Sequence, residues 1–200
     1  MFTKFNRQLL IIFSSVCLAV LMAVATSGGA SLSQRSFPEA PNDLTRVYYL
    51  GAENKLTPLP FEPGMTSLNV FVPAIKDAIV RVVLKGSAAA TVLANNNPRF
   101  YVFVADRMDP APHQLVRLTS QRSARELRIS VIKGRKGYAP FESDNVKLDR
   151  RILERLRVEA GKGRYLFVNY MQIRPLTTLS PGEYAIIGDS LSDMATFRIQ

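Results

Sequence analysis

The chain has 200 residues, a net charge of +10 from 26 basic and 16 acidic side chains, and a single cysteine, Cys17. Because Cys17 lies in an N-terminal apolar run, the remaining chain has no thiol for a disulfide, a thiolate metal site or a cysteine nucleophile. The roughly 170 residues beyond position 30 are enough for one ordinary domain held by its own core. We expect no cofactor and no metal.

The first 30 residues have the three parts of a secretory signal. Lys4 and Arg7 precede an uncharged apolar run from Leu9 to Ala25. Two small-residue motifs are candidate cleavage sites: Ala23-Val24-Ala25 and Gly28-Gly29-Ala30. The run is longer than the roughly 7–15 residues of a signal core and shorter than the about 20 of a membrane span. Residues 1–30 are therefore predicted to be a signal peptide or a membrane anchor.

Either alternative predicts that the rest of the chain is exported. The protein is expected to be periplasmic or secreted, and a retained segment would tether it to the inner membrane through residues 8–25. After this segment the chain has no cysteine and no Asn-x-Ser/Thr sequon, which favours a bacterial envelope protein over a eukaryotic secreted one.

Beyond residue 30 the pattern predicts a linker followed by strands. Residues 31–43, SLSQRSFPEAPND, are polar and punctuated by proline, which predicts a flexible linker. Residues 44–200 are predicted to form one β-sandwich domain. Its predicted strands are 46–50, 55–59, 67–72, 78–84, 100–104, 114–118, 125–132, 165–173, 183–187 and 195–199. Such spacing predicts an all-β fold, a Greek-key antiparallel β-sandwich of about 8–10 strands with at most one short helix.

Two segments carry more specific expectations. Residues 165–173, YLFVNYMQI, are apolar on nearly both faces, as in a central strand. Within residues 148–158, apolar side chains recur four apart from Leu148 onward, which predicts a short amphipathic helix. The end of that segment, Leu156–Ala160, alternates as a strand would, so a strand is the alternative.

The sequence Leu179-Ser180-Pro181-Gly182-Glu183-Tyr184 predicts a turn that leads into a late strand. Pro181 presets φ for the first central position of a turn, and Gly182 accepts the positive φ of a type II turn. This Leu-x-Pro-Gly-x-Tyr pattern resembles the tyrosine corner of immunoglobulin-like, fibronectin-type and carboxypeptidase-regulatory (transthyretin-like) domains. The resemblance implies a Greek-key sandwich in which the Tyr184 hydroxyl bonds upstream backbone, and it gives Pro181, Gly182 and Tyr184 structural roles.

Near the C-terminus, Gly188-Asp189-Ser190-Leu191 resembles the nucleophile motif of the GDSL esterases and lipases. In that family the serine lies close to the N-terminus and an Asp-x-x-His follows near the C-terminus. Here ten residues follow Ser190, and His113 is the sole histidine of the chain. Because a serine nucleophile needs a base within hydrogen-bond reach, we interpret the motif as a polar turn between two strands.

Other candidate motifs are also weak. Asp106 with Asp109, or Asp189 with Asp193, offers oxygen ligands but not the ordered string of a calcium loop. Gly134–Gly137 and Gly161–Arg164 are basic, glycine-containing stretches without the Gly-Lys-Ser/Thr of a P-loop, and we interpret them as hairpin turns.

Basic charge is concentrated in residues 117–174, which hold fifteen Lys and Arg against six Asp and Glu. Such a stretch fits either solvated strand faces or contact with an anionic partner. The candidate contact residues are Arg122, Arg125, Arg135, Lys136, Arg150, Arg151 and Lys162. Export disfavours nucleic acid as the partner.

These observations predict a non-enzymatic binding or assembly module of the bacterial cell envelope that meets a protein partner through strand edges or loops. The alternative is recognition of an anionic envelope component, such as lipid headgroups, lipopolysaccharide or polysaccharide, by the basic stretch. A serine esterase at Ser190 is the remote third hypothesis.

Overall fold

The computed structural model describes residues 37–68, 78–106, 113–131, 139–188, 190, 191 and 193–200. Phe37–Gln200 form one compact unit. The predicted signal or anchor, Asp109, Arg135, Lys136 and Asp189 lie outside the described residues. Within the described ranges, no helix has both the length and the apolar character needed to cross a membrane.

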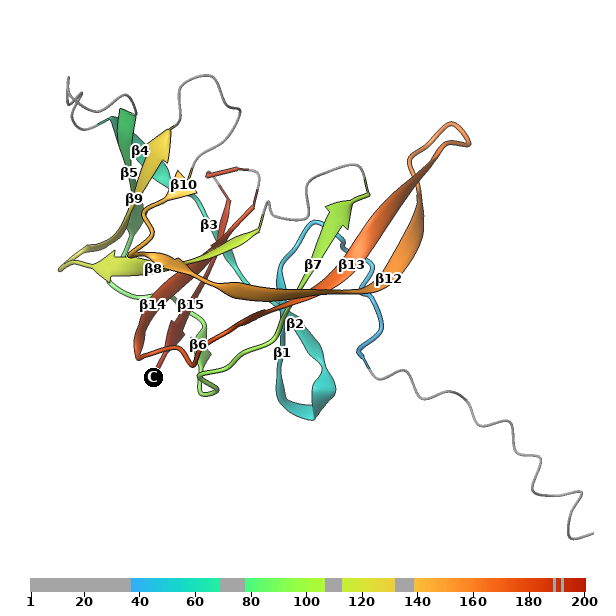
Figure 1. The fold of residues 1–200 in the computed structure, drawn as a ribbon, viewed down its shortest axis with the longest axis horizontal. Coiled ribbons are helices and arrows are strands. Elements are labelled where there is room, and N and C mark those ends of the chain that lie inside the picture. The colour runs from blue at the N-terminus through green and yellow to red at the C-terminus, as the bar shows by residue number, and fades with distance from the viewer. Residues whose placement is uncertain (1–36, 69–77, 107–112, 132–138, 189, 192) are drawn as a thin grey trace, which may run out of the picture. The chain divides into compact units, whose positions relative to one another are not determined.

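Strands make up two sheets, so the all-β prediction is confirmed (Figure 1). In spatial order the five-stranded sheet contains β12 (Leu148–Glu159), β13 (Tyr165–Pro175), β7 (Phe100–Ala105), β1 (Tyr48–Leu50) and β2 (Leu56–Pro58). The larger sheet contains β3 (Phe61–Glu62), β15 (Met194–Ile199), β14 (Gly182–Ile187), β8 (Gln114–Ser120), β9 (Ala124–Val131), β5 (Ala78–Lys85) and β4 (Met65–Leu68).

Short strands add to the larger sheet beyond the predicted set. They are β10 (Ala139–Pro140) beside β9, β11 (Asn145–Val146) beside β8, and β6 (Val92–Leu93) beside β15. The β6–β15 contact is parallel and every other strand pair in the described chain is antiparallel. Non-consecutive neighbours such as β7 with β13 and β8 with β14 are the crossing connections of a Greek-key sandwich.

The main core lies between the two sheets. The five-stranded sheet contributes Phe100 and Met171, and the larger sheet contributes Ile186 and Phe197, all buried in one cluster. The Phe100 and Phe197 rings meet across the sheets with centroids 4.9 Å apart. Alternate residues of β7, β13, β14 and β15 belong to this cluster, as expected for the inner faces of a sandwich.

The larger sheet also curls on itself and encloses a second core. Strands β3 and β9 are separated by three strands in the sheet order, yet the Arg125 side chain of β9 bonds Glu62 of β3. A second cluster, which includes Val82, Leu127 and Ala185, fills the curl. Strand β14 is therefore buried on both faces, as its continuous Tyr-Ala-Ile-Ile sequence requires.

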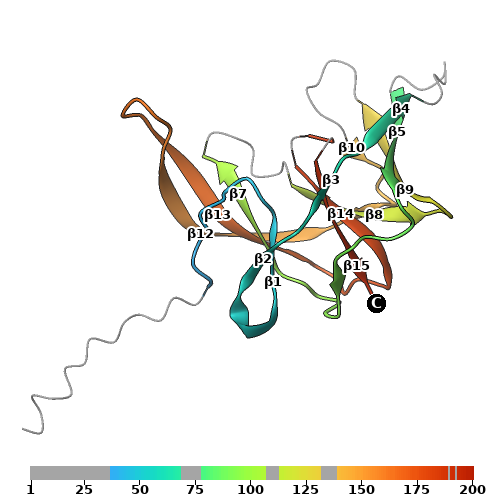
Figure 2. The same cartoon turned by 180° about the vertical axis from the view of Figure 1, so that it is seen from behind.

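The tyrosine corner predicted at Tyr184 is present (Figures 1 and 2 show the chain passing from β13 to β14 here). The Tyr184 hydroxyl donates to the carbonyl oxygen of Ser180 at 2.8 Å, and the ring stacks on Phe197. Gly182 differs from the prediction, because its φ of +154° and its place in β14 are not those of a type II turn. A Cβ there would lie 3.3 Å from Nη2 of Arg117, which donates to the Pro181 carbonyl, so glycine makes room for that guanidinium.

The predicted flexible linker is wrong over residues 37–43, which pack on the outer face of the five-stranded sheet. The Phe37 ring meets Tyr170 edge-on, and the Tyr170 hydroxyl donates to the Pro38 carbonyl at 3.1 Å. The Tyr48 hydroxyl donates to the Asp43 carbonyl at 2.7 Å. Two tyrosines thus hold this segment over an aromatic cluster.

The helix predicted over residues 148–158 is wrong, because Leu148–Glu159 form the edge strand β12. Spacing of four places side chains on one face of a strand as well as of a helix, so the pattern did not distinguish the two. Pairing with the long strand β13 determines the outcome, and a bulge between Ile152 and Glu154 shifts the register. As a result Leu148 packs on the inter-sheet core and Leu156 on the outer aromatic cluster.

Candidate functional site

The predicted anionic-contact residues that the structure describes do not form one patch. Arg122 lies in the turn between β8 and β9 and is exposed, whereas Arg150 and Arg151 are exposed near the start of β12. Lys162 lies in the turn between β12 and β13. From Arg151 the strand runs eight more residues to its end at Glu159, which is roughly 26 Å at about 3.3 Å per residue, and Lys162 lies beyond that end.

Arg125 is not a surface residue, so its assignment as a contact for a partner is wrong. Its side chain is 1% exposed and donates to the carbonyls of Gly86 at 3.1 Å and Lys85 at 2.9 Å, and to the Glu62 carboxylate. Glu62 also accepts from the Thr196 hydroxyl, and buried Glu183 lies 3.8 Å from Arg125 Nη1. The guanidinium therefore links β9 to β3 and β14 and holds the curl of the larger sheet together.

A different group of basic side chains gathers at the free end of the β12–β13 hairpin. We define the hairpin end as Arg155–Phe167 (Figure 1). Strand β7 pairs with β13 over Val168–Ile173, and the Asp106 amide after β7 donates to the Phe167 carbonyl at 2.9 Å. Among the described strands, only β12 pairs with β13 beyond this point. Its charged side chains are Arg155, Arg157, Lys162 and Arg164 against Glu159, a net charge of +3 (four minus one).

Cross-strand pairs organise this ribbon. The Arg155 guanidinium lies 4.2 Å from the centroid of the Phe167 ring, and that of Arg157 lies 3.7 Å from the centroid of Tyr165. Arg155 also forms an ion pair with Asp106, which accepts from the Asn169 amide at 3.3 Å. A two-stranded ribbon is marginally stable on its own. These cation–π contacts, together with the Asp106 interactions where the ribbon joins the sheet, stabilise it.

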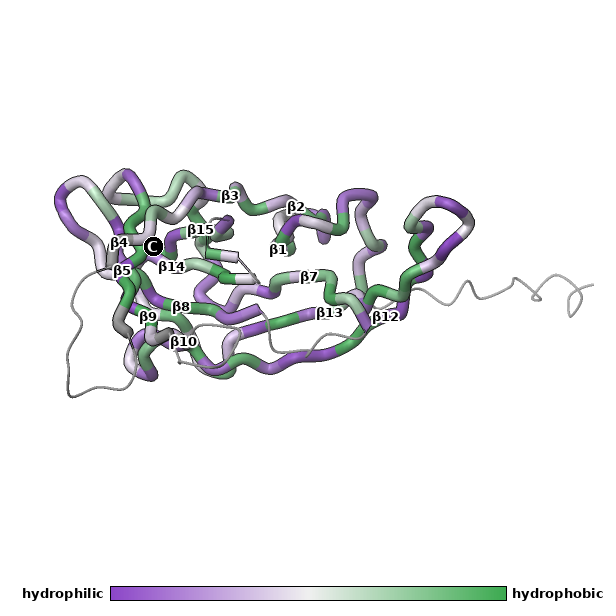
Figure 3. The backbone as a smooth tube through the Cα atoms, turned by 90° about the horizontal axis from the view of Figure 1, so that it is seen from above, coloured by the Kyte–Doolittle hydropathy of each residue, from purple (hydrophilic) through white to green (hydrophobic). Residues whose placement is uncertain are grey.

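The opposite face of the ribbon is aliphatic. Val158 pairs with Leu166 and Leu156 with Val168. Leu166 is 57% exposed, and on the other face Tyr165 and Phe167 are 48% and 43% exposed. Figure 3 shows hydrophilic and hydrophobic residues together at this end of the hairpin. Three consecutive large apolar side chains thus face solvent beside four basic ones.

The turn at the tip is built around two glycines. Gly161, Lys162 and Gly163 have φ values of +78°, +52° and +69°, in the left-handed region that glycine tolerates best. The turn is closed by the Ala160 amide donating to the Arg164 carbonyl at 2.8 Å. This backbone places Lys162 at the tip of the hairpin, where it and its neighbours in the turn are exposed to solvent.

Sequence reasoning missed Arg155, Arg157 and Arg164 because it placed the first two in a helix. It also treated residues 165–173 as buried along their whole length, and the central position of β13 between β12 and β7 is confirmed only from Val168 onward. The available signal was the alternation of arginines with Leu156 and Val158, which in a hairpin aligns the basic residues with the aromatic ones.

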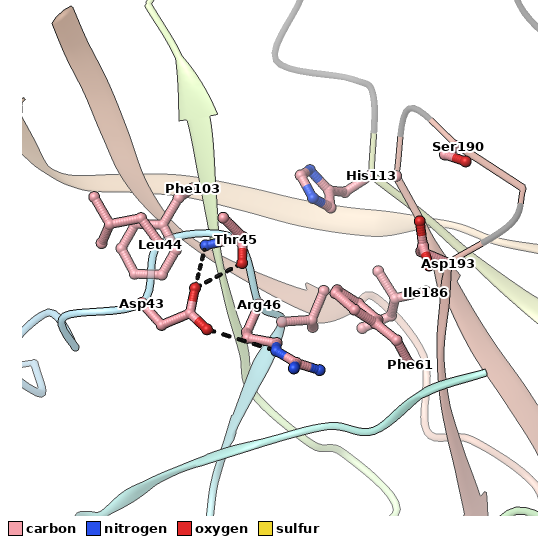
Figure 4. Close-up of a pocket in the computed structure, with 12 residues that line it drawn as sticks. Asp43, Leu44, Thr45, Arg46, Phe61, Phe103, His113, Ile186, Ser190 and Asp193 are labelled. Atoms are coloured by element: carbon pink, nitrogen blue, oxygen red, sulfur yellow. Dashed lines mark hydrogen bonds and ion pairs between the residues drawn. The ribbon is translucent and has the colours of Figure 1, made fainter. Parts of the chain in front are cut away.

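His113 and Ser190 both line one cleft of about 500 Å³ (Figure 4). The cleft is lined by Asp43, Leu44, Thr45, Arg46, Val47, Phe61, Phe103, His113, Ile186, Gly188, Ser190 and Asp193. The His113 ring lies against Gly188, where an added Cβ would be 3.7 Å from Nε2. Ser190 lies between β14 and β15, and Figure 4 shows it with His113 and Asp193 among the residues that line the cleft. The two side chains of the esterase hypothesis therefore line one cleft, and that hypothesis stays a prediction.

The opposite wall of the cleft is polar and internally bonded. Asp43 accepts from the Thr45 amide at 2.9 Å and from the Thr45 hydroxyl at 2.6 Å, and it pairs with Arg46 at 3.6 Å. The hydrogen bonds from Thr45, followed by the attraction of Arg46, lower the pKa of Asp43. The Arg46 guanidinium lies 5.1 Å from the centroid of the Phe61 ring. Asp43 thus orients Arg46 across the cleft.

The two predicted calcium-ligand pairs each include a residue outside the described part of the chain, Asp109 in one and Asp189 in the other, so both pairs stay predictions. In the part of the chain that the structure describes, no three His, Cys, Asp or Glu side chains are grouped so as to hold a metal ion. Asp106 pairs instead with Arg155.

Comparisons with models of known protein families, with curated proteins and with solved structures each find no match. The immunoglobulin-like resemblance of the corner sequence therefore stays a prediction.

Proposed function

We propose that the protein is an exported, non-enzymatic binding module of the bacterial cell envelope that recognises an anionic component through the hairpin end. The observation that carries the proposal is the gathering of four basic side chains with exposed Tyr165, Leu166 and Phe167 on a ribbon that extends past β7. Export follows from the predicted N-terminal signal.

The chemistry of the hairpin end suits phosphate or carboxylate groups. Arginine presents a rigid fork of N–H donors that matches both groups. Its electrostatic attraction to anions also acts over a longer distance at low salt. The rings of Phe167 and Tyr165 hold two of these guanidinium groups in place. Less side-chain entropy is then lost when they bind, which favours affinity.

The protein-partner alternative depends on a strand edge, and the geometry favours it less. Strand β12 is the edge of the five-stranded sheet among the described strands. It carries four arginines and a bulge, and such features protect edges against pairing with another chain. The other edge strand of this sheet, β2, has three residues. Contact through the hairpin end is therefore preferred over strand addition.

The test uses two anionic probes, vesicles containing phosphatidylglycerol and soluble dextran sulfate. The parent protein is expected to bind at least one probe, and affinity is expected to fall steeply as salt rises. Replacing Arg157, Lys162 and Arg164 with glutamine is expected to weaken binding by about 3 kcal/mol, on the order of 100-fold, since each basic residue near an anionic membrane contributes about 1 kcal/mol.

The matched control removes the same charge elsewhere. Lys55, Arg99 and Arg122 are exposed basic residues outside the hairpin end, and their triple glutamine variant is expected to bind nearly as the parent does. Binding of neither probe at low salt would refute the proposal. Equal losses in the two triple variants would also refute it, because net charge alone would then explain the binding.

A further inference from the structure

We infer that the anionic component is a phospholipid bilayer, and that the hairpin end enters the bilayer interface with Tyr165, Leu166 and Phe167. The inference rests on the anion-binding role proposed above and adds the class of partner. It starts from an excess of exposed apolar surface that charge recognition does not need.

A soluble polyanion offers charge but little apolar surface. Binding it would leave Leu166, which is 57% exposed, and the rings of Tyr165 and Phe167 in water. Exposed apolar patches beside polar residues are typical of membrane or protein contacts. Aromatic side chains in particular are enriched at the level of the lipid headgroups, where one end of the ring is apolar and the other is hydrated.

The arrangement of charges predicts shallow insertion. Lys162 lies at the tip and Arg164 at the end of the turn just before β13, so both would remain among the phosphates while their aliphatic stems lie along the apolar region. Tyr165 and Phe167 project from one face of the ribbon and Leu166 from the other, so an embedded ribbon would bury apolar side chains on both faces. No long apolar segment is required for this mode of binding.

The expected contributions are measurable. Each basic residue near an anionic membrane raises the partition coefficient roughly fivefold. Full burial of a leucine side chain raises it by more than tenfold, and because Leu166 is already about half covered, Leu166→Ser is expected to lower partition roughly fivefold to tenfold.

The first experiment uses tryptophan fluorescence, because the chain contains no tryptophan. A Tyr165→Trp variant of the full chain carries one reporter at the hairpin end. With phosphatidylglycerol vesicles its emission is expected to shift to the blue and to resist a water-soluble quencher. Dextran sulfate is expected to leave the emission nearly unchanged. An emission that stays unshifted on bound vesicles would overturn the inference.

The second experiment compares Leu166→Ser with Ile152→Ser. Ile152 is 55% exposed on the same hairpin, but it lies ten residues before Lys162, near the base. Leu166→Ser is expected to weaken vesicle binding fivefold to tenfold and to leave dextran sulfate binding and the urea midpoint unchanged. Ile152→Ser is expected to change neither binding.

The outcomes separate the two claims. If Leu166→Ser binds vesicles as tightly as the parent, or if the parent binds dextran sulfate and not vesicles, insertion is refuted and the anion-binding role survives. If the parent binds neither probe, both are refuted. If vesicle binding needs no anionic lipid, the apolar contact survives and the anion-binding role is refuted.

Discussion

Replacing Tyr184 with phenylalanine tests whether the corner hydroxyl stabilises the crossing from β13 to β14. The hydroxyl donates to the Ser180 carbonyl at 2.8 Å, and the residue is 2% exposed with its ring stacked on Phe197. Phenylalanine keeps the ring in the core and removes the hydroxyl alone. The variant therefore isolates one hydrogen bond in the chain between the two sheets.

The expected loss is about 1 kcal/mol in the free energy of unfolding. A net hydrogen bond contributes about 0.5–1.5 kcal/mol. Because Ser180 is exposed, its carbonyl is able to bond water in the variant, so the full penalty of an unsatisfied buried group does not apply. In a domain of this size such a loss lowers Tm by about 2–4 °C.

Urea and thermal unfolding, followed by circular dichroism, measure the change. Tyr184→Ala also removes the ring and is expected to cost about 3–5 kcal/mol, because it leaves a cavity in the core between the sheets. Tyr165→Phe, at a half-exposed position on the hairpin end, is the control and is expected to change stability little. If Tyr184→Phe leaves the urea midpoint unchanged, or costs as much as Tyr184→Ala, the hydroxyl does not have the role assigned to it.

Three further predictions concern the buried charges, the tyrosines and the serine motif. Arg125→Met is expected to cost about 3–5 kcal/mol, because it leaves the Glu62 and Glu183 carboxylates uncompensated, and changing both glutamates to glutamine as well is expected to restore part of the loss in urea unfolding. Burial raises the pKa of Tyr170 above its ordinary value of 10.0. The stabilisation that comes from this raised pKa is complete below pH 10 and is lost as pH rises. The free energy of unfolding is therefore expected to fall above pH 10, and to fall less steeply in Tyr170→Phe. Ser190→Ala is expected to leave hydrolysis of acyl esters at the parent's level, and a specific loss of activity would instead support the esterase.

Local sequence signals predicted those parts of the fold in which a segment determines its own structure. The hairpin of β1 and β2, the alternation that buries Leu127 and Ile129, and the Tyr184 corner are confirmed. Each depends on turn residues or on a period of two within a few positions. Long-range contacts decided the rest.

The wrong predictions for residues 37–43 and for Arg125 arise from contacts with distant residues, which the sequence of one segment does not reveal. Residues 37–43 are polar and proline-rich, yet Tyr170, which lies far along the chain, holds Pro38 on the sheet, and nearby Tyr48 bonds Asp43. Arg125 lies in an alternating, basic strand that predicted exposure, and it is buried because Glu62 and Glu183 come to it when the larger sheet curls. Charge counted along the chain therefore overestimated the basic surface at this position.

The same comparison explains why the hairpin end, and not the whole basic stretch, is the proposed contact. The apolar run of β13 begins at Tyr165, but β7 pairs with it only from Val168, and one further bond joins Asp106 to the Phe167 carbonyl. A run that served the core alone would end where its partner strand ends, because exposed apolar residues and an ordered two-stranded ribbon both cost free energy. Here the run continues for three more residues, and Arg155 and Arg157 face its rings from the neighbouring strand. Basic and apolar groups held together outside the core fit a surface that is itself both anionic and apolar, and a lipid bilayer is such a surface.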